Sequence, residues 1–311
     1  MLLARRRIQP HLRPTALHEY APLNELLQAT VYVKHENHLP TGAFKVRGGI
    51  NLVSQLDPEE RERGIIGAST GNHGQSLAYA GRLFGVRTII CAPAAANPVK
   101  VASMRGLGAE LILEGDRYDD AREHCEALAH EHGYRYVHSG NEPLLIAGVA
   151  THTLEVLEER PEVEVLLVPI GGGSGAAGAC LAAAALKPGL EVIGVQSASA
   201  PAAYRSWKRG RLTEAPNTTF AEGLATATAF ELPQRILRQH LKDFLLVSDE
   251  ELAQATRLMI EHTRNLVEPA AAAPLAGALQ IKPSLQGRTV ALICSGGNLS
   301  PAQLLQLFRD S

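Results

Sequence analysis

The chain of 311 residues is organised around the stretch His38-Leu39-Pro40-Thr41-Gly42-Ala43-Phe44-Lys45-Val46-Arg47-Gly48-Gly49. Within it, the turn signal Pro40-Thr41-Gly42 precedes Lys45, and the following residues can continue as a helix to about Leu56. A lysine at a helix start lies near the positive end of the helix dipole, which disfavours its ammonium form. Burial would lower the pKa of the amine further. Lys45 could therefore act as a nucleophile that forms a Schiff base with an aldehyde. A solvated surface lysine is the alternative interpretation, and other stretches of the chain must decide between the two.

The composition is that of an ordinary globular protein, with 45% apolar and 20% charged residues. The formal net charge is -2 and no basic face is evident, which argues against nucleic acid as a partner. The four cysteines form no CxxC pair, so neither a zinc site nor a disulfide framework is predicted. Neither a signal peptide nor a long apolar run is found. We therefore expect a cytoplasmic protein without a membrane partner.

Strand and helix patterns alternate from Gly64 onward, which predicts parallel sheets with helices on their faces. Strands are expected at residues 64–69, 86–91, 109–113 and 134–138, and again at 163–170, 191–196, 244–247 and 288–294. A single helix is expected over residues 144–160. The fold class is thus α/β, with two doubly wound open-sheet domains and a cleft between them. We expect a small domain of residues 51–142 and a large domain of residues 1–50 plus 143–311.

A glycine loop, Gly171-Gly172-Gly173-Ser174-Gly175, follows one of the apolar strands and opens an alanine-rich helix. Backbone N–H groups of such a loop, together with the helix N-terminus, suit a phosphate. No lysine follows as in a Walker-type site, and the acidic residue of a dinucleotide site is absent from the end of the next strand. A strand-to-helix turn without a ligand is the alternative interpretation.

Two further polar stretches follow expected strands. Ser69-Thr70-Gly71-Asn72-His73-Gly74 offers hydroxyls, an amide and backbone donors at a helix start, which suits a carboxylate, although a helix cap alone would have the same composition. Ser295-Gly296-Gly297-Asn298 ends the last strand. Since ligands of open α/β sheets lie at the carboxyl ends of the strands, Ser295 is placed to offer its hydroxyl to a ligand.

Together these stretches resemble a pyridoxal-phosphate enzyme family. The chain is similar to fold type II enzymes, the tryptophan synthase β type, in the branch of serine/threonine dehydratases and serine racemases. The pattern Ser-Phe-Lys-x-Arg-Gly of that branch stands here as Ala43-Phe44-Lys45-Val46-Arg47-Gly48, and Ser-x-Gly-Asn-His as Ser69 to His73. The glycine loop and Ser295 to Asn298 match in order and spacing, so the resemblance covers nearly the whole chain.

The resemblance implies a role for each matched position. Lys45 would hold pyridoxal 5'-phosphate as a Schiff base in the cleft and act as the general base at Cα once the substrate releases it. Phe44 would lie against the cofactor ring, Asn72 would bond its phenolic oxygen, and Ser295 would meet its pyridine nitrogen. The phosphate would be bound by Gly171, Gly172, Gly173, Ser174 and Gly175. The substrate carboxylate would be bound by Ser69, Thr70, Gly71, Asn72 and His73.

A serine rather than a carboxylate at the pyridine nitrogen makes the ring a weaker electron sink, which favours β-elimination. The resemblance thus implies a lyase that dehydrates and deaminates L-threonine or L-serine to a 2-keto acid and ammonia. Alternatives on the same scaffold are an amino-acid racemase, with Thr70 as proton donor, or a dehydratase of phenylserine, hydroxyaspartate or a hydroxyectoine-derived substrate. A more remote alternative is a non-catalytic nucleotide-binding or sensor protein.

The resemblance also bears on metal, assembly and regulation. Ala221-Glu222-Gly223 is similar to a segment that lies near a divalent cation in several relatives, with Glu222 as the acidic ligand, but an ordinary acidic loop residue fits equally well. A homodimer or homotetramer is expected. The chain ends soon after Asn298, so we expect no C-terminal regulatory domain.

Overall fold

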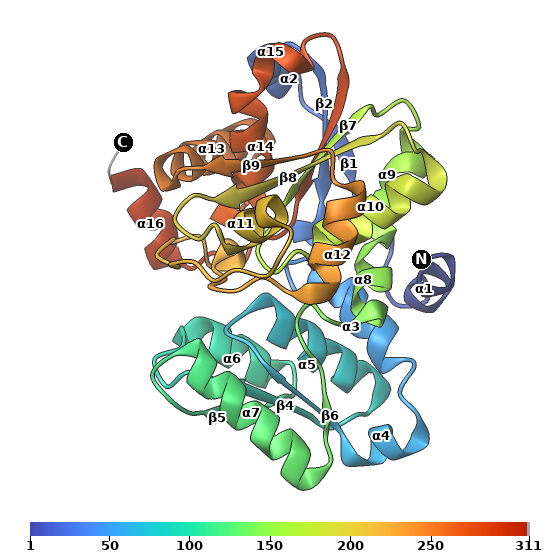
Figure 1. The fold of residues 1–311 in the computed structure, drawn as a ribbon, viewed down its shortest axis with the longest axis vertical. Helices are drawn as coiled ribbons and strands as arrows, with labels where there is room; N and C mark the ends of the chain where they lie inside the picture. The colour runs from blue at the N-terminus through green and yellow to red at the C-terminus, as the bar shows by residue number, and fades with distance from the viewer. Residues whose placement is uncertain (310–311) are drawn as a thin grey trace. The chain divides into compact units, whose positions relative to one another are not determined.

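The computed structural model describes residues 1–309, which divide into two compact units (Figure 1). The first unit holds Met1–Leu12 and Lys45–Val149, and the second holds Arg13–Phe44 and Ala150–Ser311. The sequence places the corresponding domain boundaries at residues 50/51 and 142/143. The chain crosses from the second unit into the first at the peptide bond between Phe44 and Lys45, because helix α3 (Lys45–Val53) packs against helices of the first unit.

The second unit is built on a six-stranded sheet in the order β1-β2-β10-β7-β8-β9. Its strands are β1 (Leu17–Glu19), β2 (Thr30–His35), β7 (Val165–Pro169), β8 (Glu191–Ser197), β9 (Asp243–Val247) and β10 (Thr289–Cys294). All neighbouring pairs are parallel except β1 with β2. The expected strands of this series are therefore confirmed, and the carboxyl ends of the five parallel strands meet at one edge of the sheet.

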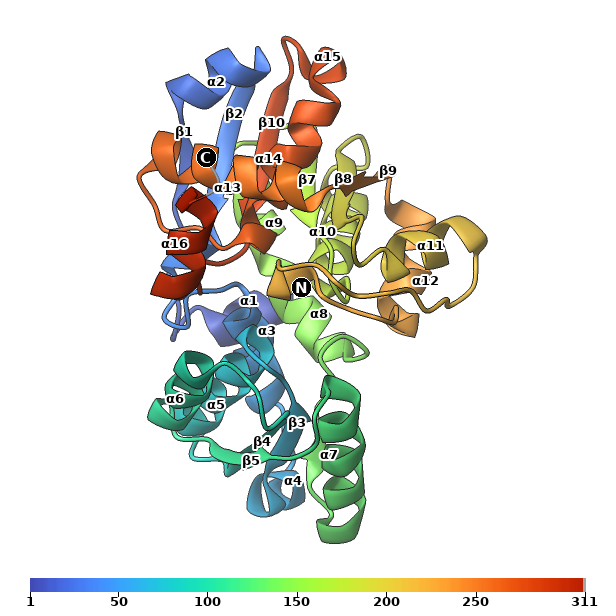
Figure 2. The same ribbon diagram turned by 90° about the vertical axis from the view of Figure 1, so that its left-hand side faces the viewer.

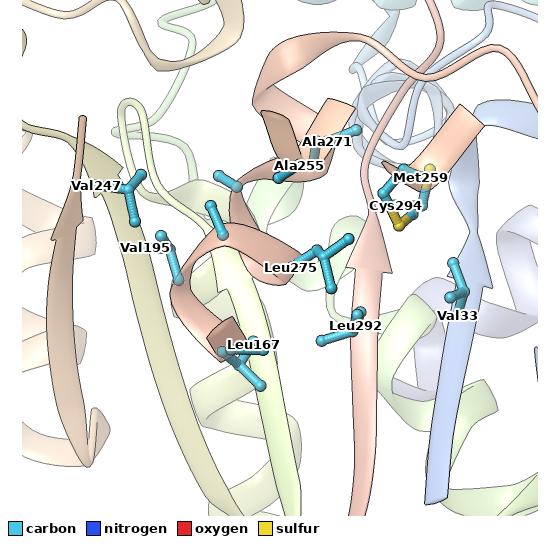
Figure 3. Close-up of a cluster of buried hydrophobic side chains, with 14 of the residues drawn as sticks. Val33, Leu167, Val195, Val247, Ala255, Met259, Ala271, Leu275, Leu292 and Cys294 are labelled. Atoms are coloured by element: carbon cyan, nitrogen blue, oxygen red, sulfur yellow. The ribbon is translucent and has the colours of Figure 1, made fainter. Parts of the chain in front are cut away.

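Alternating side chains of these strands form two cores, one on each face of the sheet. Val290 and Leu292 pack with helices α13 (Asp249–Thr263) and α14 (Pro269–Gln280), as Figure 3 shows around Leu275 and Leu292. Ala291 and Ile293 point to the opposite core. That core includes residues of α9 (Thr151–Glu159), α10 (Ser174–Leu186), α11 (Ala202–Arg209) and α12 (Glu231–His240). The two-residue period of the strands explains why this sheet is covered on both faces.

The first unit contains a fully parallel four-stranded sheet in the order β5-β4-β3-β6. Its strands are β3 (Ile65–Ala68), β4 (Thr88–Ala92), β5 (Glu110–Leu113) and β6 (Arg135–Tyr136). Helix α7 (Tyr118–His132) covers one face, while α5 (Asn72–Phe84) and α6 (Pro98–Gly106) lie on the other (Figure 2). This covering by helices on both faces confirms the doubly wound arrangement expected from the sequence.

One expected helix is divided in the structure. Residues 144–160 form α8 (Pro143–Val149) in the first unit and α9 in the second, with Ala150 between them. Helix α8 packs closely on α3, since a methyl group on Gly148 would lie 2.6 Å from the carbonyl oxygen of Arg47. Helix α9 packs instead on α10. A periodic apolar pattern does not reveal that its two halves pack on different partners.

The sequence patterns did not predict several shorter elements. These are α1 (Leu2–Ile8), α2 (Ala21–Leu27), β1, α4 (Pro58–Arg63), α12 and α15 (Lys282–Leu285), together with the 3-10 turns η1 (Glu36–His38) and η2 (Glu222–Leu224). The remaining helix is α16 (Pro301–Arg309). Among the described residues, none of the helices combines the length and the apolar character needed to cross a bilayer.

Candidate functional site

Lys45 is the first residue of α3 in the first unit. Its Nζ donates a hydrogen bond of 3.1 Å to the carbonyl oxygen of Ser139, and its own carbonyl accepts one of 2.7 Å from Ser76 Oγ on α5. Although part of the side chain is accessible to solvent, burial of the amine lowers the pKa of Lys45 to about 8. The amine can therefore lose its proton near neutral pH, as a nucleophile or a general base must.

The loop from Ser69 to His73 connects β3 to α5. Ser69 Oγ accepts hydrogen bonds from the backbone N–H of Gly71 (3.1 Å) and of Gly74 (2.9 Å), which closes the loop. Ser69 and Gly71 are buried, whereas Thr70 and Asn72 are partly exposed. The N–H groups of Asn72 and His73 lie in the first turn of α5, where a helix supplies no carbonyl partner. The first turn of α5 therefore offers backbone donors that suit an anion.

His73 has an arrangement that the sequence did not show. Its Nε2 lies 3.1 Å from the carbonyl oxygen of Val137, which can only accept, so Nε2 carries the proton. Burial, followed by the charge of Lys45, lowers the pKa of His73 to about 3, and the ring is neutral. Nδ1 is thus an acceptor, and the ring has no N–H left for a carboxylate. Only the backbone N–H of His73 can serve the predicted carboxylate site.

The segment Val137–Ser139 brings these groups together within the first unit. It directly follows β6, binds the ring of His73 through Val137 and binds the amine of Lys45 through Ser139. Between them, His138 Nδ1 accepts hydrogen bonds of 3.0 Å from the N–H groups of Gly140 and Asn141. Sequence reasoning missed this segment, and the one available signal was its position after a parallel strand.

Lys100 adds a positive charge to the predicted carboxylate loop. It lies on α6, is 9% exposed, and its Nζ would lie 3.5 Å from a methyl group placed on Gly71. Gly71 is the N-cap of α5, so the ammonium stands beside the positive end of a 13-residue helix. Both features favour an anion at this loop. No sequence pattern singled out Lys100.

In the second unit, the residues before Lys45 pair with the predicted serine motif. Phe44 N–H donates to the carbonyl oxygen of Ser295 (3.0 Å), Gly297 N–H donates to Gly42 (2.9 Å), and Ala43 and Gly296 form an antiparallel bridge. We call residues 42–44 with 295–297 the strap. Asn298 Nδ2 donates to the carbonyl oxygen of Thr41 (2.8 Å), just before Gly42, whose φ is +66°. The strap thus brings Ser295 next to Phe44.

The glycine loop joins β7 to the N-terminus of α10. The ring of Phe44 covers it, since a methyl group on Gly175 would lie 3.0 Å from Phe44 Cε2. The ring of Phe230 lies directly against Gly172, and the carbonyl oxygen of Gly223 lies directly against Gly171. A side chain at either glycine would collide with these neighbours. Gly173 has a φ of +90°, and Ser174, which begins the 13-residue helix, is 3% exposed. The first-turn N–H groups give this loop the donors that a phosphate requires.

Glu222, the predicted cation ligand, accepts a hydrogen bond of 2.8 Å from Gln303 Nε2. Within residues 1–309, no group of three or more His, Cys, Asp or Glu side chains is arranged to hold a metal ion. Within the described part of the chain, Glu222 therefore belongs to no such group.

Each unit, taken by itself, holds groups that suit one part of pyridoxal phosphate. The first unit supplies a desolvated amine of low pKa for an aldehyde, and the second supplies a helix N-terminus for a phosphate. Phe44 and Ser295 add an aromatic face and a hydroxyl in the second unit.

Comparison with known proteins agrees with the resemblance to pyridoxal-phosphate enzymes that the sequence motifs indicate. The family model described as pyridoxal-phosphate dependent enzyme matches residues 8–296. An L-threonine ammonia-lyase of Thermotoga maritima is 36% identical over 297 residues, covering 95% of this chain and 74% of the relative. An L-threo-3-hydroxyaspartate ammonia-lyase of Saccharomyces cerevisiae is 38% identical over 302 residues, covering 96% and 92%. The crystal structure of serine racemase from Dictyostelium discoideum aligns with a TM-score of 0.90 at 30% identity, covering 96% of this chain and 97% of that one.

Proposed function

This chain belongs to the family of pyridoxal-phosphate dependent enzymes, and from this premise we propose that it is an ammonia-lyase that converts a β-hydroxy amino acid to a 2-keto acid and ammonia. L-threonine and L-serine are the foremost substrates. The bound cofactor supplies the electron sink that holds the electron pair of the broken Cα–H bond. The observation that carries the proposal is the amine of Lys45, desolvated and directed at a carbonyl oxygen on the loop after a parallel strand.

Lys45 has two tasks in this proposal. It binds the cofactor covalently, and its free amine takes the proton from the substrate Cα. An amine with a pKa of about 8 is partly unprotonated near neutral pH, so it can accept a proton. It is also basic enough to retain the proton that it takes from Cα. The hydrogen bond to the carbonyl oxygen of Ser139 orients Nζ.

The substrate carboxylate is held by the loop from Ser69 to His73. The donors are backbone N–H groups in the first turn of α5 and the partly exposed side chains of Thr70 and Asn72, with Lys100 beside Gly71 adding positive charge. Such a site accepts the carboxylate that all α-amino acids share, so it does not by itself select the side chain.

Phosphate binding is assigned to Gly171–Gly175 at the N-terminus of α10, and the hydroxyl of Ser295 to the pyridine nitrogen. The support is the covering of the loop by Phe44 and the hydrogen bond between Phe44 and Ser295. A hydroxyl, unlike a carboxylate, does not hold a proton on that nitrogen, and this favours elimination over transamination.

The test combines absorbance with a product assay. Protein supplied with pyridoxal phosphate should absorb near ~410–420 nm, the region typical of a lysine-bound cofactor, and should form keto acid from L-threonine or L-serine. Lys45→Ala should lose the band and lower keto-acid formation by more than about a thousandfold. Lys208→Ala, which changes a lysine over surface aromatic rings, is the matched control. A band that persists in Lys45→Ala would refute the assignment.

The comparisons leave two competing activities to be tested with the same protein. The racemase structure favours α-proton exchange with inversion, and the yeast relative favours 3-hydroxyaspartate as substrate. A panel of threonine, serine, phenylserine, 3-hydroxyaspartate and hydroxyectoine-derived substrates, assayed for keto acid and for α-proton exchange, separates them. Inversion with little keto acid would replace the lyase by a racemase.

A divalent cation at Glu222 and a homodimer or homotetramer belong to the same proposal. If a cation binds, chelation should lower the melting temperature of the wild-type protein and leave that of Glu222→Gln unchanged. Light scattering during size-exclusion chromatography tests the assembly, and a monomer would contradict it.

A further inference from the structure

We propose that His73 is a positioning residue for Lys45, whose protonated amine donates a hydrogen bond to Nδ1 of the neutral His73 ring. The inference rests on the proposed function, in which Lys45 takes a proton from the substrate Cα. It gives the ring of His73 a task other than carboxylate binding.

The first observation is an acceptor without a partner. His73 is 6% exposed, and among the described residues its Nδ1 has no hydrogen-bond partner. Because Nε2 donates to the carbonyl oxygen of Val137, Nδ1 bears the lone pair. A buried acceptor without a donor costs free energy, and such groups in native proteins call for an explanation. A hydrogen-bond donor that reaches Nδ1 only during the reaction, such as the protonated amine of Lys45, would explain the unpaired acceptor.

The second observation is the neighbourhood of this acceptor. The carbonyl oxygens that bind His73 and Lys45 belong to Val137 and Ser139, two residues apart and therefore within about 7 Å along the chain. The charge of Lys45 acts on His73, where it helps to lower the pKa of the ring. The two side chains thus bind the same short segment of the first unit, and the charge of one acts on the other.

The third observation concerns the competing groups. His138 is the other titratable group whose charge acts on His73, but its Nδ1 already accepts from Gly140 and Asn141. An ammonium has three N–H donors, and Ser139 accepts one of them. The Nδ1 atom of His73 supplies a further acceptor. A neutral imidazole suits this task, since an imidazolium would repel the ammonium.

The proposal assigns no proton transfer to His73. Lys45 Nζ takes the proton from Cα and keeps it, and His73 holds the resulting ammonium in place. An additional acceptor also favours the charged form of the amine, so His73 opposes the effect of burial on the pKa of Lys45.

Two substitutions separate the acceptor from the structural bond. His73→Gln places an amide nitrogen where Nε2 lies, which keeps the bond to Val137 and removes the acceptor. His73→Asn places its amide oxygen where Nδ1 lies, which keeps the acceptor and removes that bond. Circular dichroism and thermal unfolding of the full chain show whether each variant is folded.

The readout without cofactor is the pKa of Lys45 in the apoprotein, from trace labelling with acetic anhydride at a series of pH values. His73→Gln should lower this pKa by about half a unit to one unit, and His73→Asn should leave it near the wild-type value. With cofactor, His73→Gln should lower kcat about tenfold with little change in KM, and should raise the deuterium isotope effect at Cα.

Two results would overturn the inference. One is a wild-type pKa of Lys45 in His73→Gln. The other is an equal loss in both variants, which would show that only the bond to Val137 matters. Failure of the proposed function is distinguishable, because it would be seen as a missing absorbance band and missing keto acid in the wild-type protein.

Discussion

At the scale of single residues, Gly172 shows why the phosphate loop is built from glycine. The ring of Phe230 lies where a β-carbon of residue 172 would be. We expect Gly172→Ala to lower the free energy of unfolding by about 1–3 kcal/mol through overpacking, measured by urea unfolding. Gly189→Ala, with open space around it, should stay within about 0.5 kcal/mol of wild type. Equal effects at the two positions would contradict this explanation.

His35, at the end of β2, predicts a pH dependence of stability. Burial lowers the pKa of His35 from 6.5 to about 4. Below pH 6.5 the unfolded chain binds a proton at this residue and the folded chain does not, so stability falls as the pH is lowered toward 4. The free energy of unfolding falls by up to about 3 kcal/mol over this pH range. His35→Gln should remove this part of the slope in denaturant titrations between pH 7 and 4, and the exposed His240→Gln should not.

At the scale of elements, the strap fixes the residues that precede Lys45. Asn298 supports it through the hydrogen bond to Thr41, and Asn298→Ala should release Gly42–Phe44. We expect about 1 kcal/mol of lost stability and a drop in kcat of about tenfold or more, because Phe44 and Lys45 would be less well oriented.

The matched control is Gln280→Ala. Gln280 also uses its side-chain amide to hold a backbone carbonyl, that of Leu246, but it lies at the exposed end of α14. Gln280→Ala should lose about as much stability as Asn298→Ala and should keep the wild-type kcat. If both variants lost activity alike, the strap would have no special role.

At the scale of the whole molecule, each unit has a core of its own. Ile66 belongs to the core of the first unit and Leu292 to that of the second, and both are almost fully buried. Truncation to alanine should cost about 2–5 kcal/mol in each case. We expect hydrogen exchange to rise mainly in residues 45–149 for Ile66→Ala and mainly in residues 150–309 for Leu292→Ala. Acceleration over the whole chain in both variants would show that the units open together.

Sequence patterns predicted the sheets of both units because each strand and helix has a local period. The short elements α1, α2 and β1 lack such a pattern in a polar, proline-containing segment, and the prediction missed them. The helix over residues 144–160 was predicted as one element because its apolar spacing continues through Ala150. Its division depends on which partners the two halves contact, and local periodicity carries no information about partners.

The motifs could be found from the amino-acid order: a lysine at a helix start, and a glycine loop and two polar stretches that each follow a strand directly. These are short-range features, and parallel strands carry such loops to one edge of their sheet. Only the tertiary structure decided that Ser295 pairs with Phe44, that Ser139 receives the amine of Lys45 and that His73 is a neutral acceptor. These contacts join residues that are 64 to 251 positions apart, and they depend on burial, which exists only in the folded chain.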